Sequence, residues 1–138
     1  MKELFDVHCH MVPGVDDGAA DLEESLAMLK MQHEDGVRKI IITPHYRRRM
    51  FETPAKKVHE QFLKLQEAAK KEYPDMSLYL GCELHSNMDL QDILEKRKYV
   101  TMAGSSYVLL EFSEGDSAQH IRERVYNVPV SYTHLTLP

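Results

Sequence analysis

The sequence has 138 residues, of which 43% are hydrophobic, and a formal net charge of -5 at pH 7. This length supports one domain with a single core, and the acidic balance disfavours a nucleic-acid-binding protein, which needs a basic surface for phosphates. Since no apolar run reaches the ~20 residues of a membrane-spanning helix and the N-terminus lacks a signal-peptide pattern, we expect a cytoplasmic protein without membrane insertion.

Strand and helix patterns alternate along the chain. Apolar runs of period two or of β-branched residues predict four strands, over residues 4–12, 37–43, 77–82 and 107–112. Apolar stripes at helical spacing predict four helices, over residues 21–35, 54–73, 90–94 and 117–127. Asp21 and Glu24 form a capping pattern, Gly36 suits a C-terminal cap, and Thr53 is the expected N-cap before Pro54. This order indicates an α/β fold with a parallel sheet, either doubly wound or part of a barrel.

Potential ligands follow every predicted strand. They are His8, His10, Asp16, Asp17, His45, Glu83 and Glu111. The carboxyl ends of parallel strands meet at one rim, so these side chains are expected to converge there. The period-two rule places His8 and His10 on the same face, with Cα atoms roughly 6.5–7 Å apart, so that both imidazoles can reach one ion.

The same rule turns Cys9 and Cys82 away from this rim, and we expect both cysteines to be reduced. A site of nitrogen and oxygen ligands suits Mn²⁺, Fe²⁺, Zn²⁺ or Mg²⁺ better than a Cys-rich zinc site. A carboxylate such as Glu83 or Glu111 can bridge two ions, which is the arrangement that clamps the attacking and leaving oxygens in phosphoester hydrolysis.

Simpler interpretations stand beside these. A His-x-His pair on a strand is often a polar surface pair, and Asp16 and Asp17 are residues that also form turns. Arg47, the first of three consecutive arginines, is placed either to meet a substrate phosphate or in a solvated loop. Two interpretations of His85 remain open: it supports the ligand residues, or it lies at the surface. The remaining histidines considered, His33, His59 and His120, are expected at the surface.

Three stretches carry a family resemblance. They are Asp-Val-His-Cys-His-Met-Val-Pro-Gly-Val-Asp-Asp-Gly-Ala at 6–19, Thr-Pro-His at 43–45 and Gly-Cys-Glu at 81–83. With them the chain resembles the PHP (polymerase and histidinol phosphatase) superfamily, and within it the bacterial metal-dependent protein-tyrosine phosphatases of the capsule and exopolysaccharide (CpsB/CapC/YwqE) type. The resemblance implies a truncated TIM-like (β/α) barrel, of which this chain supplies the first four β/α units.

The resemblance also implies a function and a ligand set. The implied metal ligands are His8, His10, Asp17, His45, Glu83 and Glu111. They would hold up to three ions, usually manganese, and hydrolyse phosphotyrosine on the tail of a bacterial tyrosine kinase that controls polysaccharide export. The alternatives are another PHP phosphoesterase, acting on histidinol phosphate or a nucleotide, and an inactive half-domain that at most binds a metal ion weakly.

The end of the chain departs from the family pattern. The later half of such proteins carries His-x-Glu-Arg and Asp-x-His motifs and phosphate-binding arginines, which this sequence lacks. Residues 129–138 can be written in codons that resemble a transposon adaptor, so His134 is not taken as a ligand. We therefore expect residues 1–128 to be the N-terminal half of a phosphatase domain and residues 129–138 to be a non-native tail.

Overall fold

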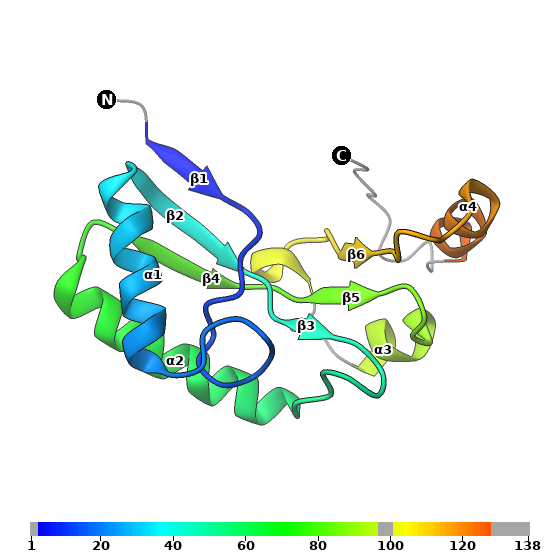
Figure 1. Ribbon diagram of the computed structural model, residues 1–138, viewed down its shortest axis with the longest axis horizontal. Coiled ribbons are helices and arrows are strands. Elements are labelled where there is room, and N and C mark those ends of the chain that lie inside the picture. The colour runs from blue at the N-terminus through cyan, green and yellow to red at the C-terminus, as the bar shows by residue number, and fades with distance from the viewer. Residues whose placement is uncertain (1–2, 97–100, 128–138) are drawn as a thin grey trace.

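The computed structural model describes residues 3–96 and 101–127, and the predicted tail at 129–138 lies outside them (Figure 1). The strands are β1 (Leu4–Asp6), β2 (Val37–Ile42), β3 (His45–Tyr46), β4 (Ser77–Leu80), β5 (Glu83–His85) and β6 (Leu109–Glu111). The helices are α1 (Leu22–Glu34), α2 (Ala55–Glu72), α3 (Leu90–Lys96), α4 (Ala118–Tyr126) and the short 3-10 helix η2 (Met102–Gly104). None of the helices in this part of the chain is long and apolar enough to cross a membrane.

The strands form two parallel sheets, in the orders β1-β2-β4 and β3-β5-β6. In Figure 1, β3 and β5 continue the directions of β2 and β4. Backbone hydrogen bonds bridge the break, from Gly81 N to Ile42 O at 2.8 Å and from Glu83 N to Pro44 O at 3.0 Å. The predicted parallel α/β arrangement is confirmed, although the described strands do not close into a barrel.

Two predicted strands are shorter or broken. The strand predicted at 77–82 ends two residues early as β4, a further strand that was not predicted, β5, follows it, and the strand predicted at 107–112 is β6 alone. The break has a local cause, because Pro44 lacks the N–H that a ladder needs. In the neighbouring segment, a Cβ added to Gly81 would lie 3.0 Å from Met102 Sδ and 3.3 Å from Thr43 Cγ2, so the packing around this glycine is tight.

The strand predicted at 4–12 is wrong beyond Asp6. The amide of His8 donates to the Asp6 side chain at 3.0 Å instead of to a neighbouring strand. The apolar residues therefore do not share one face: Phe5 and Val7 are exposed and line a cavity of about 150 Å³ with Ile41, whereas Cys9 packs against the main core.

Helix ends follow the sequence signals with one exception. Asp21 Oδ1 accepts from Glu24 N at 2.9 Å, and Gly36 has a positive φ of 93°, as predicted for the two ends of α1. The prediction of Thr53 as N-cap of α2 is wrong. Pro54 occupies the cap without a side-chain bond, and the Thr53 hydroxyl donates to Val15 O at 2.8 Å. Helix α3 also runs past the predicted residue 94.

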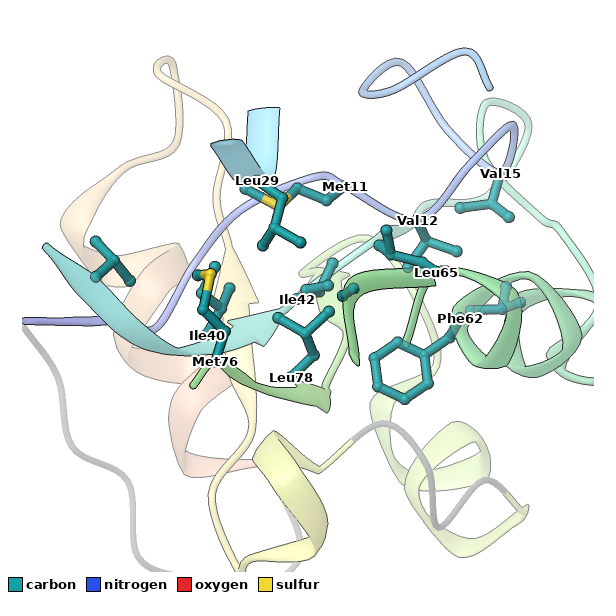
Figure 2. Packing of buried hydrophobic residues seen from close by; sticks show 13 residues of the cluster. Met11, Val12, Val15, Leu29, Ile40, Ile42, Phe62, Leu65, Met76 and Leu78 are labelled. Carbon is teal, nitrogen blue, oxygen red and sulfur yellow. The ribbon is translucent and has the colours of Figure 1, made fainter. Parts of the chain in front are cut away.

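The main core lies between the first sheet and helices α1 and α2 (Figure 2). Ile40 and Ile42 of β2 are fully buried there with Leu29 of α1 and Leu65 of α2. A smaller cluster supports the second sheet and consists of Cys82, Leu84, Met88, Leu90 and Ile93. Both cysteines are free, and burial, followed by the charges of Asp6 and Asp16, raises the pKa of Cys9 to about 12.

Candidate metal centre

Six predicted ligands meet where the strands break. Their potential ligand atoms form three overlapping groups, each within 4.8 Å: His8, His10 and Glu83; His10, Asp17 and His45; and His45, Glu83 and Glu111. His45 and Glu83 follow the carboxyl ends of β2 and β4 as the first residues of β3 and β5, Glu111 ends β6, and the segment after β1 carries the others. The convergence expected from parallel strands is therefore present.

Glu83 lies at the middle of the cluster. Its Oε2 is 3.3 Å from His10 Nε2 and 3.2 Å from His45 Nδ1, and its Oε1 is 3.6 Å from His8 Nε2. Burial by itself raises the pKa of Glu83, but the hydrogen bond from His10 and the charges of His8 and His45 lower it below its ordinary value. A carboxylate is thus held ionised among three imidazoles.

His45 joins the remaining ligands. Its Nε2 lies 3.5 Å from Asp17 Oδ1, and its Nδ1 lies 3.7 Å from Glu111 Oε2. The ring is stacked between those of His10, at 4.4 Å between centroids, and Phe51, at 5.1 Å with planes 15° apart. These two contacts fix the plane of His45 without using its nitrogen atoms.

Asp16 supports the cluster from behind. Its fully buried side chain accepts from His10 Nδ1 at 3.1 Å and from the backbone amides of His45 at 2.9 Å and Gly18 at 3.0 Å. Burial raises the pKa of Asp16, but these bonds outweigh it and the pKa is lowered. The hydrogen bonds to Asp16 and Glu83 in turn raise the pKa of His10 to about 10, against the opposing effect of burial.

Sequence analysis missed two residues that hold the histidines. The Thr43 hydroxyl is 2.7 Å from His8 Nδ1 and completely buried, and Phe51 stacks on His45. The position of Thr43 at the end of a predicted strand, two residues before His45, was a usable signal. Phe51 carried none, because its contact depends on the turn that brings Arg47 N within 2.9 Å of Phe51 O.

The residues fit a divalent metal. Three buried polar atoms, His45 Nδ1, Glu83 Oε2 and Glu111 Oε2, lie 3.2 Å or more from the polar atoms that face them and form no well-aligned hydrogen bond among the described residues. Unsatisfied buried polar atoms are costly, and a cation would satisfy all three. The donors are imidazole nitrogens and carboxylate oxygens, a set that suits Mn²⁺, Fe²⁺ and Zn²⁺. Neither cysteine belongs to the groups, as predicted.

Other singled-out residues lie apart from the ligand groups. His85 is neither at the surface nor a member of these groups: it is 3% exposed, and its Nε2 lies 3.2 Å from Ser113 Oγ. His33 contacts Asp75 at 3.0 Å, near the other end of the sheet. Arg47 follows β3 with a half-buried side chain, and its role toward a phosphate stays a prediction.

Comparison with known families places this cluster in context. Residues 4–133 match the family described as capsular polysaccharide synthesis, CpsB/CapC. The chain belongs to this family. It is 39% identical over 125 residues to tyrosine-protein phosphatase CpsB of Streptococcus pneumoniae and 27% identical to tyrosine-protein phosphatase YwqE of Bacillus subtilis. Each alignment covers 91% of this chain but only 51% of CpsB and 49% of YwqE. The chain therefore spans about half the length of these relatives.

A solved structure agrees in fold. It is described as belonging to a study of YwqE from Bacillus subtilis and CpsB from Streptococcus pneumoniae, "unique metal-dependent tyrosine phosphatases". The TM-score is 0.79 with 27% sequence identity, over 91% of this chain and 51% of that one. The CpsB/CapC resemblance inferred from the motifs is therefore confirmed, and the parallel α/β fold is shared over half the length of that structure.

Proposed function

We propose that this chain supplies the first half of a metal-dependent protein-tyrosine phosphatase. The observation that carries the proposal is the overlap of three ligand groups through His10, His45 and Glu83. Shared ligands of this kind suit neighbouring divalent ions, which supply Lewis-acid polarisation of phosphoryl oxygens. The similarity to proteins named tyrosine-protein phosphatase selects phosphotyrosine among phosphoesters.

The ligands in this proposal are His8, His10, Asp17, His45, Glu83 and Glu111, holding up to three ions, with Mn²⁺ as the metal. The substrate is the phosphotyrosine tail of a bacterial tyrosine kinase of polysaccharide export, which the capsular family supports. Residues 1–128 belong to the phosphatase domain, and residues 129–138 are a non-native tail.

The residues of this chain have separable tasks in the proposed reaction. Glu83, His10 and His45 set the position of the ions, since each belongs to two of the ligand groups. Asp16 keeps the Nε2 of His10 directed at the cluster by engaging Nδ1. Arg47, next to β3, contacts the substrate phosphate, because a guanidinium binds phosphate oxygens bidentately.

Metal binding tests the proposal on this chain directly. Titration of the purified chain with Mn²⁺ by calorimetry is expected to show saturable binding that Glu83→Gln weakens by at least about tenfold, because the central carboxylate is lost. His59→Ala, at an exposed position of α2, is the matched control and should bind as the parent does. Unchanged binding in Glu83→Gln would contradict the ligand assignment.

The substrate is tested on a full-length relative. Hydrolysis of a phosphotyrosine peptide is compared with that of histidinol phosphate and a nucleoside monophosphate, with and without chelator. We expect preference for the phosphotyrosine peptide and loss of activity with chelator. Preference for either small phosphoester would replace the tyrosine phosphatase assignment with another phosphoesterase, and activity undiminished by chelator would overturn the metal-dependent mechanism.

A further inference from the structure

A polar cleft lies beside the metal centre and takes no part in it. Its volume is about 440 Å³. The segments after β3 and β5 form two of its walls, and α3 and the end of α4 form the others. Its polar lining residues are Arg48, Asn87, Asp89, Gln91, Arg124 and Asn127.

Chain geometry places the cleft at the same rim as the ligands. His45 and Glu83 are paired in the register of β3 and β5. Arg48 follows His45 by three residues and Asn87 follows Glu83 by four, so their Cα atoms lie at most about 11 and 14 Å from those of the ligands. Figure 1 shows both segments turning from the strand ends toward α3. The cleft is therefore within reach of a peptide held at the centre by its phosphate.

The net charge of the cleft lining is positive, because Arg48 and Arg124 stand against one acidic residue, Asp89. Arg48 is exposed, and in the described part of the chain its guanidinium has no ion pair or hydrogen-bond partner, in common with Arg47 and Arg49. The guanidinium of Arg124 donates to the carbonyl oxygens of Ser86 and Met88. These bonds hold α4, one wall of the cleft, against the segment after β5. The acidic lining residue, Asp89, is engaged at the start of α3, where its Oδ1 accepts from Asp92 N at 3.1 Å.

We propose that this cleft binds an acidic side chain of the peptide substrate, with Arg48 as the residue that selects it. The inference rests on the proposed function, because it requires a phosphotyrosine at the metal centre. An extended peptide advances about 3.3 Å per residue, so a glutamate or aspartate two to four positions from the phosphotyrosine reaches Arg48. The guanidinium pairs with a carboxylate through two parallel hydrogen bonds, whereas a neutral side chain offers no such partner.

Two peptides test this selection. Each has a central phosphotyrosine and a fluorescent label; one carries glutamates on both sides and the other glutamines. Their binding to the purified chain with Mn²⁺ is measured by fluorescence anisotropy, with the unphosphorylated peptides as reference. At low salt we expect the acidic phosphopeptide to bind up to about fivefold more tightly than the neutral one, and the difference to shrink as salt is added.

Variants assign the preference to the cleft. Arg48→Gln is expected to abolish the difference between the two phosphopeptides while leaving the binding of the neutral one unchanged. Arg122→Gln removes the same charge from an exposed position of α4 outside the cleft and should retain the preference. Equal affinities in the parent chain, or a preference that survives Arg48→Gln, would overturn the inference and leave the proposed function standing. Phosphopeptides that bind no better than the unphosphorylated ones would overturn both.

Discussion

Asp16 Oδ2 lies 3.1 Å from His10 Nδ1 and also accepts the backbone N–H of His45 at 2.9 Å. One buried carboxylate thus positions two ligands that come from different parts of the chain. Such an outer carboxylate orients an imidazole and strengthens its basicity as a ligand, and its loss generally lowers metal affinity about 10–100-fold.

We therefore expect Asp16→Ala to weaken Mn²⁺ binding by about 10–100-fold, measured by calorimetry at constant pH. Asp16→Asn keeps an oxygen acceptor, so its affinity for Mn²⁺ should fall between those of Asp16→Ala and the parent. Asp35→Ala, at the exposed C-cap of α1, is the control and should leave the affinity unchanged. If Asp16→Ala binds Mn²⁺ as tightly as the parent, the orienting role is refuted.

Gly18 lets the loop after the first two ligands fold back on itself. A Cβ added there would collide with the backbone oxygen of His10 and lie 2.5 Å from His10 Cβ. Both atoms belong to a ligand residue, so the loop cannot yield without moving the site. We expect Gly18→Ala to lower the free energy of unfolding by about 1–3 kcal/mol, the cost of overpacking, and to weaken Mn²⁺ binding.

Gly115→Ala serves as the control for this variant, because nothing lies within 4 Å of a Cβ added at that position. Urea unfolding and Mn²⁺ titration of both variants give the comparison. If Gly18→Ala has the same stability and Mn²⁺ affinity as the parent, the loop can accommodate a Cβ at this position, and the prediction is wrong.

Two leucines of α2 test whether this helix packs on the first sheet through its predicted face. Leu65 is fully buried against β2, whereas Leu63, two positions away, is 45% exposed. Leu65→Ala is expected to reduce the free energy of unfolding by about 2–5 kcal/mol, through lost burial and the cavity left behind. Leu63→Ala should change it by less than about 0.5 kcal/mol in the same urea titration. Equal effects would mean that α2 does not pack on the sheet through this face.

Sequence pattern predicted the convergence of the candidate ligands better than it predicted the bounds of the strands. His45, Glu83 and Glu111 could be placed because a strand that ends in a ligand delivers it to the shared rim whatever its exact length. The break of the sheet could not be placed, because it depends on two segments far apart in the sequence, at Pro44 and at Gly81, that interrupt neighbouring strands at the same level. The role of Asp16 was equally hidden, since an Asp in a turn and an Asp behind a histidine have the same sequence context.

A charge cluster at the opposite end of β2 and β4 from the candidate ligands gives a pH-dependent prediction. Asp75 accepts from His33 Nε2 at 3.0 Å and pairs with Arg38 Nε at 2.9 Å, so it links α1, β2 and the loop before β4. The hydrogen bond from His33 is the largest effect and lowers the pKa of Asp75 below 3.8; burial opposes it, and the charges of His33 and Arg38 lower the pKa further. A lowered pKa means that the unfolded chain takes up the proton first, so the stabilisation is complete above the unfolded value of 3.8 and is lost as pH falls through the folded value.

Asp75→Asn is therefore expected to unfold at a lower urea concentration than the parent near neutral pH, and the gap should close as the pH falls through the lowered pKa of the folded state. Glu72→Gln is the control, because Glu72 is exposed and lacks an ion pair within the described ranges. It should match the parent near neutral pH. The measurement is urea unfolding of the three proteins at several pH values, and a gap for Asp75→Asn that stays constant down to the lowest pH would mean that the stability of this corner does not come from the ionised carboxylate.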